Sequence, residues 1–237
     1  MNGVLDIQDI PKMLEWYLAF LFSTTLHEAA HAWTAWKLGD DTARRGGQVT
    51  LDPRPHIRRE PIGMVVVPLA SFWFGGWMIG WASAPFNAYW AVQYPRRAGL
   101  MAIAGPLSNL CLALLAGLAI VAGVAIHLFQ APAVLQFGHM TEALNGGWAE
   151  ILASVLSILL SLNLLLGIFN LLPLPPLDGA SMLLLFFKRQ TAAKIFGVIR
   201  HQTVQFFGIY FAWKWFGYVF RPVQRLVTHL LYPGVFY

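Results

Sequence analysis

Long apolar stretches alternate with short polar loops along most of the chain. Four of these stretches have the roughly 20 residues that a helix needs to cross a bilayer. Three of the four predict transmembrane helices, over 12–38, 98–128 and 151–173. We also expect a helical C-terminal region over 180–237, in which 201–220 either crosses the membrane or lies at its surface.

The remaining apolar stretch, residues 61–95, has a different pattern. Proline and glycine interrupt it repeatedly, and its valine run favours extended backbone. Non-helical backbone at membrane depth must be buried against protein or line a watery cavity, because lipid offers no hydrogen bonds. We therefore predict a re-entrant β-strand region within 46–95, with Val65, Val66 and Val67 in a strand.

Positive charge in the loops predicts the orientation, because Lys and Arg concentrate on the cytoplasmic side of membrane proteins. The loops 40–60, 96–97 and 178–200 are basic, whereas 129–149 has neither Lys nor Arg. A re-entrant segment at 61–95 places all three basic loops on the cytoplasmic side. The expected fold is an α-helical, multi-pass (polytopic) membrane protein with a three-helix core, a re-entrant β-strand region and C-terminal helices.

Composition supports a membrane protein. Hydrophobic residues make up 57% of the 237 residues and charged residues 11%, against roughly 45–50% and 25% in ordinary soluble domains. The 16 Lys and Arg lie in short clusters rather than a continuous stripe, which argues against nucleic-acid binding. Little of the chain remains for a separate soluble module, so we expect residues 1–237 to form a single membrane-embedded domain without a secretory signal peptide.

The first predicted helix contains the sequence HEAAH at 27–31. His27 and His31 are four residues apart and so lie on one face of a helix, where their imidazoles can hold one zinc ion. Glu28 is placed to deprotonate a water activated by the metal and then to protonate the leaving amine. Ionisable residues at bilayer depth cost roughly 2.5–3.5 kcal/mol each and are functional by default, which favours a metal site over chance.

A catalytic zinc usually has three protein ligands and one open position. Asp178 is the one acidic residue that follows Glu150, and it comes directly after the helix predicted over 151–173. The predicted topology brings Asp178 to the same cytoplasmic side as the two histidines, so it is a candidate third ligand. It could instead cap the next helix, since Asp is favoured at that position.

At this point the sequence resembles the site-2 protease family of intramembrane zinc metalloproteases, in its short form without a PDZ domain. The resemblance is carried by HEAAH at 27–31, GPLSN at 105–109 and NLLPLPPLDG at 170–179. It implies one Zn²⁺ per chain held by His27, His31 and Asp178, with Glu28 as the general base.

The resemblance also implies roles for residues around the metal. Asn170 is a candidate to steady the substrate or the oxyanion, and a contact that only joins helices is its alternative. In GPLSN, Gly105 lets helices approach closely, Pro106 is expected to open the third helix, and Asn109 faces the site. An exposed strand at Val65 to Val67 would hold an unwound substrate by backbone pairing.

The predicted function is hydrolysis of peptide bonds within or near transmembrane segments of other proteins, with the active site towards the cytoplasmic side. The expected partners are a transmembrane protein or peptide substrate and the lipid bilayer. One alternative is a metal or proton transporter or sensor that uses the same cluster. Another is a non-catalytic scaffold that binds transmembrane helices. Glu28 discriminates among them, because a hydrolase needs it.

Overall fold

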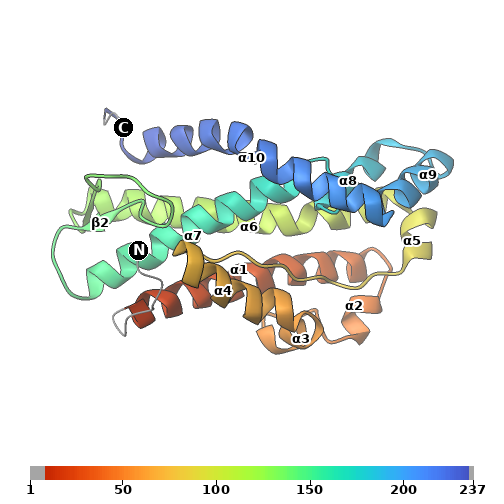
Figure 1. The fold of residues 1–237 in the computed structure, drawn as a ribbon, viewed down its shortest axis with the longest axis horizontal. Helices are drawn as coiled ribbons and strands as arrows, with labels where there is room; N and C mark the ends of the chain where they lie inside the picture. The colour runs from red at the N-terminus through yellow and green to blue at the C-terminus, as the bar shows by residue number, and fades with distance from the viewer. Residues whose placement is uncertain (1–8, 235–237) are drawn as a thin grey trace.

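The computed structural model describes residues 9–234, so the two ends of the predicted domain, 1–8 and 235–237, lie outside the described residues. Three long helices lie side by side along the long axis of the molecule (Figure 1). They are α1 (Ile10–Lys37), α6 (Pro95–Ala125) and α7 (Trp148–Leu171). These correspond to the helices predicted over 12–38, 98–128 and 151–173, and each begins two or three residues earlier than expected.

Helices α6 and α7 are long and apolar enough to cross a membrane. Much of α6 is exposed, and large apolar side chains such as Leu107, Leu114 and Leu118 cover that outer face. Pro106 lies inside α6, so the expectation that it opens the helix is wrong; α6 begins instead at Pro95, whose fixed φ suits a first turn. Apolar side chains pointing outward are what a helix in contact with lipid requires.

Helix α1 has more polar residues than α6 or α7, and it turns them inward. Ser23, Thr25, His27, Glu28 and His31 are all buried in the molecule. Polar groups in an apolar environment need partners within the protein. The polar face of α1 therefore packs against α6 and α7, and the site develops at this contact.

Much of 46–95 is helical, where a re-entrant β-strand region was expected. The region contains α3 (Pro53–Arg59), the π-helix η2 (Ile62–Val66), α4 (Val67–Gly75) and α5 (Ala88–Gln93), and α2 (Thr42–Arg45) precedes it. Val65 and Val66 lie in η2 and Val67 is the first residue of α4, so the predicted strand there is wrong. Strand propensity is a weak, packing-dependent preference, and a helix pairs its own backbone groups without needing a neighbouring strand.

The strands of the described chain are in the loop that joins α6 to α7. They are β1 (Phe129–Gln130) and β2 (Glu142–Ala143), which pair antiparallel. The Tyr232 hydroxyl, just past the last helix, donates to the Met140 carbonyl beside them at 3.1 Å. The short sheet thus closes the end of the molecule remote from the HEAAH motif.

Residues 78–87 form an irregular extended segment that runs past α1 between α4 and α5 (Figure 1). A few hydrogen bonds hold it: the Trp81 amide donates to the Gly63 carbonyl at 3.1 Å, and the Asn87 amide to Asp40 Oδ2 at 2.7 Å. Gly80 lies directly against the Gly63 carbonyl. The extended backbone expected in this region exists, but it lies after the valine run.

The C-terminal region is helical, as expected, in its described part. It contains α8 (Asp178–Met182), the 3₁₀ helix η3 (Leu183–Phe186), α9 (Arg189–Ile199) and α10 (Gln202–Leu231). Helix α10 runs along the outside of α6 and α7 (Figure 1). A buried cluster that includes Ile120, Leu160 and Phe220 joins these three helices.

We expect Gly80→Ala to destabilise the protein. A Cβ at this position would lie 2.2 Å from the Gly63 oxygen and 2.6 Å from Phe20 Cζ, so the extended segment must move. Overpacking of this kind lowers the free energy of unfolding by about 1–3 kcal/mol. Thermal unfolding in detergent measures the change.

Gly197→Ala is the matched control, because no atom lies within 4 Å of its added Cβ and the residue is in the interior of α9. Alanine there should raise stability by up to about 1 kcal/mol. Equal melting temperatures for Gly80→Ala and the wild type would contradict the close contact described above.

Candidate metal centre

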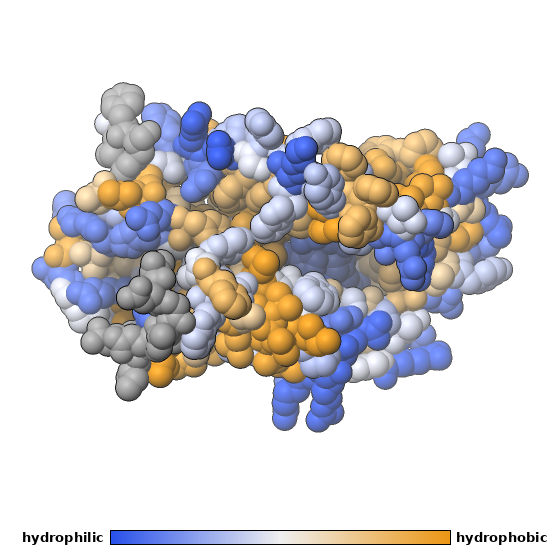
Figure 2. Space-filling view, in the orientation of Figure 1, coloured by the Kyte–Doolittle hydropathy of each residue, from blue (hydrophilic) through white to orange (hydrophobic). Residues whose placement is uncertain are grey.

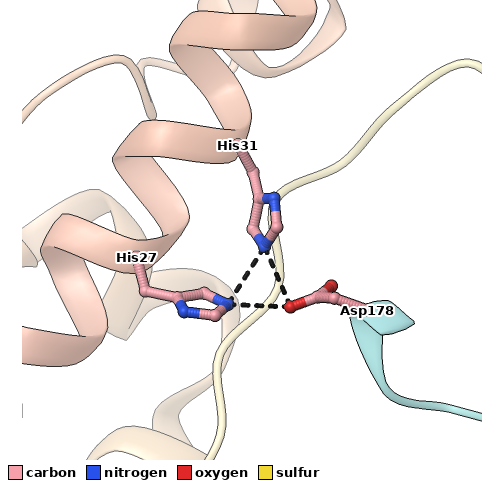
Figure 3. Close-up of side chains that lie close together, drawn as sticks. All are labelled: His27, His31 and Asp178. Atoms are coloured by element: carbon pink, nitrogen blue, oxygen red, sulfur yellow. Dashed lines mark hydrogen bonds and ion pairs between the residues drawn. The ribbon is translucent and has the colours of Figure 1, made fainter. Parts of the chain in front are cut away.

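The two histidines of the HEAAH motif and Asp178 converge on one point (Figure 3). His27 Nε2 and His31 Nε2 are 3.0 Å apart, one turn from each other on α1. Asp178 Oδ2 lies 3.1 Å from His27 Nε2 and 3.3 Å from His31 Nε2. Residues separated by about 150 positions in sequence thus form one triangle of donor atoms.

Asp178 reaches the histidines because the chain turns back after α7. Helix α7 ends at Leu171, and α8 begins with Asp178 as its first residue. Leu177 occupies the cap position, and no side chain caps this helix. The carboxylate of Asp178 therefore contacts the two imidazoles rather than serving as a helix cap.

The other nitrogen of each imidazole has an oxygen partner. His31 Nδ1 donates to the Met101 carbonyl at 2.7 Å, and His27 Nδ1 lies 2.5 Å from Asn109 Oδ1. A carbonyl oxygen can only accept, so each ring has its proton on Nδ1 and, when neutral, a lone pair on Nε2. Hydrogen bonding of this kind to the remote nitrogen is the usual support of a metal-bound histidine.

These positions fit a shared zinc ion. Two imidazole lone pairs and a carboxylate oxygen within 3.0–3.3 Å of one another repel unless a proton or a metal cation lies between them. Zinc bonds of about 2.0–2.1 Å in tetrahedral arrangement separate ligand atoms by about 3.3 Å, close to the spacing observed. Two neutral imidazoles and one carboxylate are also a common ligand set of catalytic zinc.

Room for an ion exists because position 105 is glycine. A Cβ on Gly105 would lie 2.3 Å from His31 Nε2 and 2.6 Å from His27 Nε2. Helix α6 thus contributes backbone without a side chain beside the two nitrogens, and any larger residue would fill that space. The expected close helix approach at Gly105 is therefore an approach to the histidines.

A cavity of about 530 Å³ adjoins the ligand triangle and is lined by two of its members, His27 and Asp178. Glu28 lines it together with His27 and Asp178, and so does Asn170 from α7. Residues 80–83 of the extended segment and Ile209 of α10 form other parts of its wall. Figure 2 shows a hollow with hydrophilic residues at its floor between apolar surfaces on this face of the molecule.

Glu28 is buried, and within residues 9–234 its carboxylate makes no hydrogen bond or ion pair with protein. Asn170 donates one N–H to the Leu166 carbonyl of its own helix at 3.0 Å, which leaves its second N–H free of that contact. Both side chains face the cavity that borders the ligands. The sequence analysis predicted Glu28 as the general base and Asn170 as a support for the substrate or the oxyanion.

The structure places the remaining candidates elsewhere. Asn109 is fully buried behind His27 and does not line the cavity. The residues Val65, Val66 and Val67 do not line it either; residues 80–83 do. The sequence signal for that segment was the run of glycines and proline around it rather than the valines.

Comparison with known proteins agrees with this geometry. The model of Peptidase family M50 matches residues 16–213, which include all three ligands and Glu28. The chain belongs to peptidase family M50, the site-2 protease family. It is therefore a member of a family of membrane zinc metalloproteases, and the expected zinc cofactor is confirmed.

Curated relatives have matching descriptions. The chain is 40% identical over 164 residues to YwhC of Bacillus subtilis, a candidate zinc metalloprotease, over 68% of this chain and 64% of that protein. It is 33% identical over 165 residues to Rip2 of Mycobacterium tuberculosis, also a candidate zinc metalloprotease, over 69% and 54%. The chain thus spans less than two thirds of the length of these relatives. No solved structure matches it significantly.

We expect Gly105→Ala to abolish stoichiometric zinc binding, because the added methyl group occupies the space beside both Nε2 atoms. Metal analysis of the purified protein measures zinc per chain. Gly117→Ala on the same helix is the control, since its nearest neighbour atom would be 3.8 Å away. One zinc per chain in Gly105→Ala would show that the ion does not lie between these residues.

Proposed function

We propose that this chain is an intramembrane-cleaving zinc metalloendopeptidase, which hydrolyses peptide bonds within or near transmembrane segments of other membrane proteins. The observation that carries the proposal is the position of the unpartnered Glu28 carboxylate, in the wall of a cavity that is also lined by His27 and Asp178 of the His27–His31–Asp178 triangle. A hydrolase needs a general base at this place, whereas binding or transport of a metal does not.

His27, His31 and Asp178 would hold the zinc ion, which as a Lewis acid makes water a nucleophile at neutral pH and polarises a carbonyl. Glu28 accepts the proton of the attacking water and transfers it to the leaving amine, so that proton uptake and release balance. Its burial without a hydrogen-bonding partner keeps the carboxylate available for both transfers.

Asn170 supports the developing oxyanion in this proposal. Its side chain lines the same cavity, and its remaining N–H can donate to an oxygen that gains negative charge. The contact with Leu166 fixes the amide within α7, and among the described residues no side-chain hydrogen bond joins Asn170 to another helix. That arrangement favours a role in the site over one in joining helices.

The extended segment is the proposed contact for substrate backbone. Residues 80–83 line the cavity, and within residues 9–234 the amides of Ala82 and Ser83 have no hydrogen-bonding partner. A substrate must unwind before its amide can be hydrolysed, and an unwound chain needs partners for its backbone groups. Backbone pairing with an extended segment supplies them. This role therefore moves from Val65–Val67 to residues 80–83.

We further propose a multi-pass arrangement with the site towards the cytoplasmic side. The basic segments between α1 and α6 and around α9 lie at the end of the molecule where the ligands are. The β1–β2 loop, which has neither Lys nor Arg, is at the other end (Figure 1). This distribution agrees with the tendency of Lys and Arg to remain cytoplasmic. The substrate would reach the site from the bilayer, and water from the cytoplasmic side.

Two substitutions test the proposed chemistry. Glu28→Gln should retain one zinc per chain and lower peptidase activity by about 10²–10⁴-fold, because the base is lost and the ligands remain. Asp178→Ala should lose zinc and activity together. Metal analysis and cleavage of a transmembrane peptide in detergent measure both. Glu142→Gln, in the β2 strand, is the control; full activity in Glu28→Gln would rule out the proposed enzyme.

Cysteine labelling tests the orientation. In a Cys111→Ser background, which removes the chain's single cysteine, Asn145→Cys and Thr191→Cys place one exposed thiol at each end. A membrane-impermeant maleimide should label Asn145→Cys in intact cells and Thr191→Cys after the membrane is opened. The reverse pattern would place the site on the outer side.

A further inference from the structure

The buried polar network behind the metal site begins at Asn109. Its amide lies between His27 and α7: Oδ1 faces His27 Nδ1, and Nδ2 donates to Asn163 Oδ1 at 2.7 Å and to the Ser23 carbonyl at 3.3 Å. The Ser23 carbonyl can only accept, which fixes which end of the Asn109 amide is nitrogen. The oxygen end must therefore face His27.

Asn163 in turn has a fixed orientation. Its Nδ2 donates to the Leu159 carbonyl of α7 at 2.9 Å and to Ser23 Oγ of α1 at 2.8 Å. Its oxygen is thus directed at Asn109, where it accepts. Both asparagines are fully buried, so no solvent competes for these groups. Every bond along the path has one possible direction.

From this we infer that Asn163 is a positioning residue for the metal ligand His27, acting through Asn109. The oxygen of Asn163 holds the Asn109 amide, the Asn109 oxygen holds the proton of His27 on Nδ1, and the lone pair on Nε2 then faces the other ligands. This inference deepens the proposed function, since it concerns the same zinc site.

A role limited to joining helices would not require this directionality. Ser161, two residues away on α7, is also buried and makes a contact outside its own helix, since its Oγ accepts from the amide of Gly138 in the α6–α7 loop at 3.0 Å. That contact has no path to the ligands. Ser161 is therefore a matched control for the loss of one buried hydrogen bond on α7.

The test uses the purified 237-residue chain and makes two measurements. Competition with a chelator gives the zinc affinity, and the visible spectrum of the Co²⁺-substituted protein reports the geometry of the ligands. Asn163→Leu should bind zinc about 10–100-fold more weakly than the wild type and change the cobalt spectrum, as loss of support for a ligand does elsewhere. Asn163→Asp retains an oxygen for Asn109 and should restore both properties. Ser161→Ala should leave both unchanged, whatever it does to stability.

A double variant separates action through Asn109 from a general loosening. Asn109→Leu alone should weaken zinc binding at least as much as Asn163→Leu. The double variant should bind zinc as tightly as Asn109→Leu alone. If the two losses add in free energy, or Asn163→Asp falls as far as Asn163→Leu, the inference is overturned. Asn163→Ala gives the same measurement if the leucine variant is not recovered.

The wild type distinguishes the two levels of failure. If the wild-type chain binds no zinc, the proposed function fails and the inference fails with it. If the wild type binds one zinc tightly and Asn163→Leu binds it equally tightly with the same cobalt spectrum, the inference alone fails.

Discussion

The convergence of three electron-pair donors on one point is the constraint on which the rest of the structure depends. His27, His31 and Asp178 bring acceptor atoms within 3.0–3.3 Å of one another, and both histidines are buried. Such an arrangement is unfavourable unless a proton or a metal cation lies between these atoms. Helix α1 must therefore be held against both α6 and the turn before α8, and those contacts determine the packing of the core.

Helix α6 satisfies this constraint in two ways. Gly105 brings its backbone beside the imidazoles without filling the space between them, and the Met101 carbonyl and Asn109 side chain accept the Nδ1 protons one turn to either side. The opposite side of α6 is rich in exposed leucines, as contact with lipid requires. One helix thus forms an apolar outer wall, supports both histidines and borders the ion site.

The sequence predicted those parts of the site that depend on local spacing or on topology. The four-residue spacing of His27 and His31 determines a shared helix face, and the loop charges brought Asp178 to the same end. The valine run at 65–67 misled, because strand propensity depends on packing partners that the sequence does not specify. The network behind the ligands could not be predicted, because the partners of Asn163 lie 54 and 140 positions away and a lone asparagine gives no sign of the direction of its hydrogen bonds.

Zinc binding and helix packing should therefore be coupled in this protein. The ligands come from α1 and from the first residue of α8, and the network behind them joins α1, α6 and α7, so an ion that binds all three ligands stabilises one arrangement of four helices. A ligand that binds only the folded state adds RT ln(1 + [L]/Kd) to stability, about 2.7 kcal/mol at a hundredfold excess over Kd.

The buried asparagines act on helix packing and on zinc binding at once. They satisfy each other's hydrogen bonds in an apolar core, and they hold His27 in the one tautomer that can bind the ion. Because the same hydrogen bonds join α1, α6 and α7 and orient His27, the polar interior of this helix bundle is explained by the metal site rather than by packing alone.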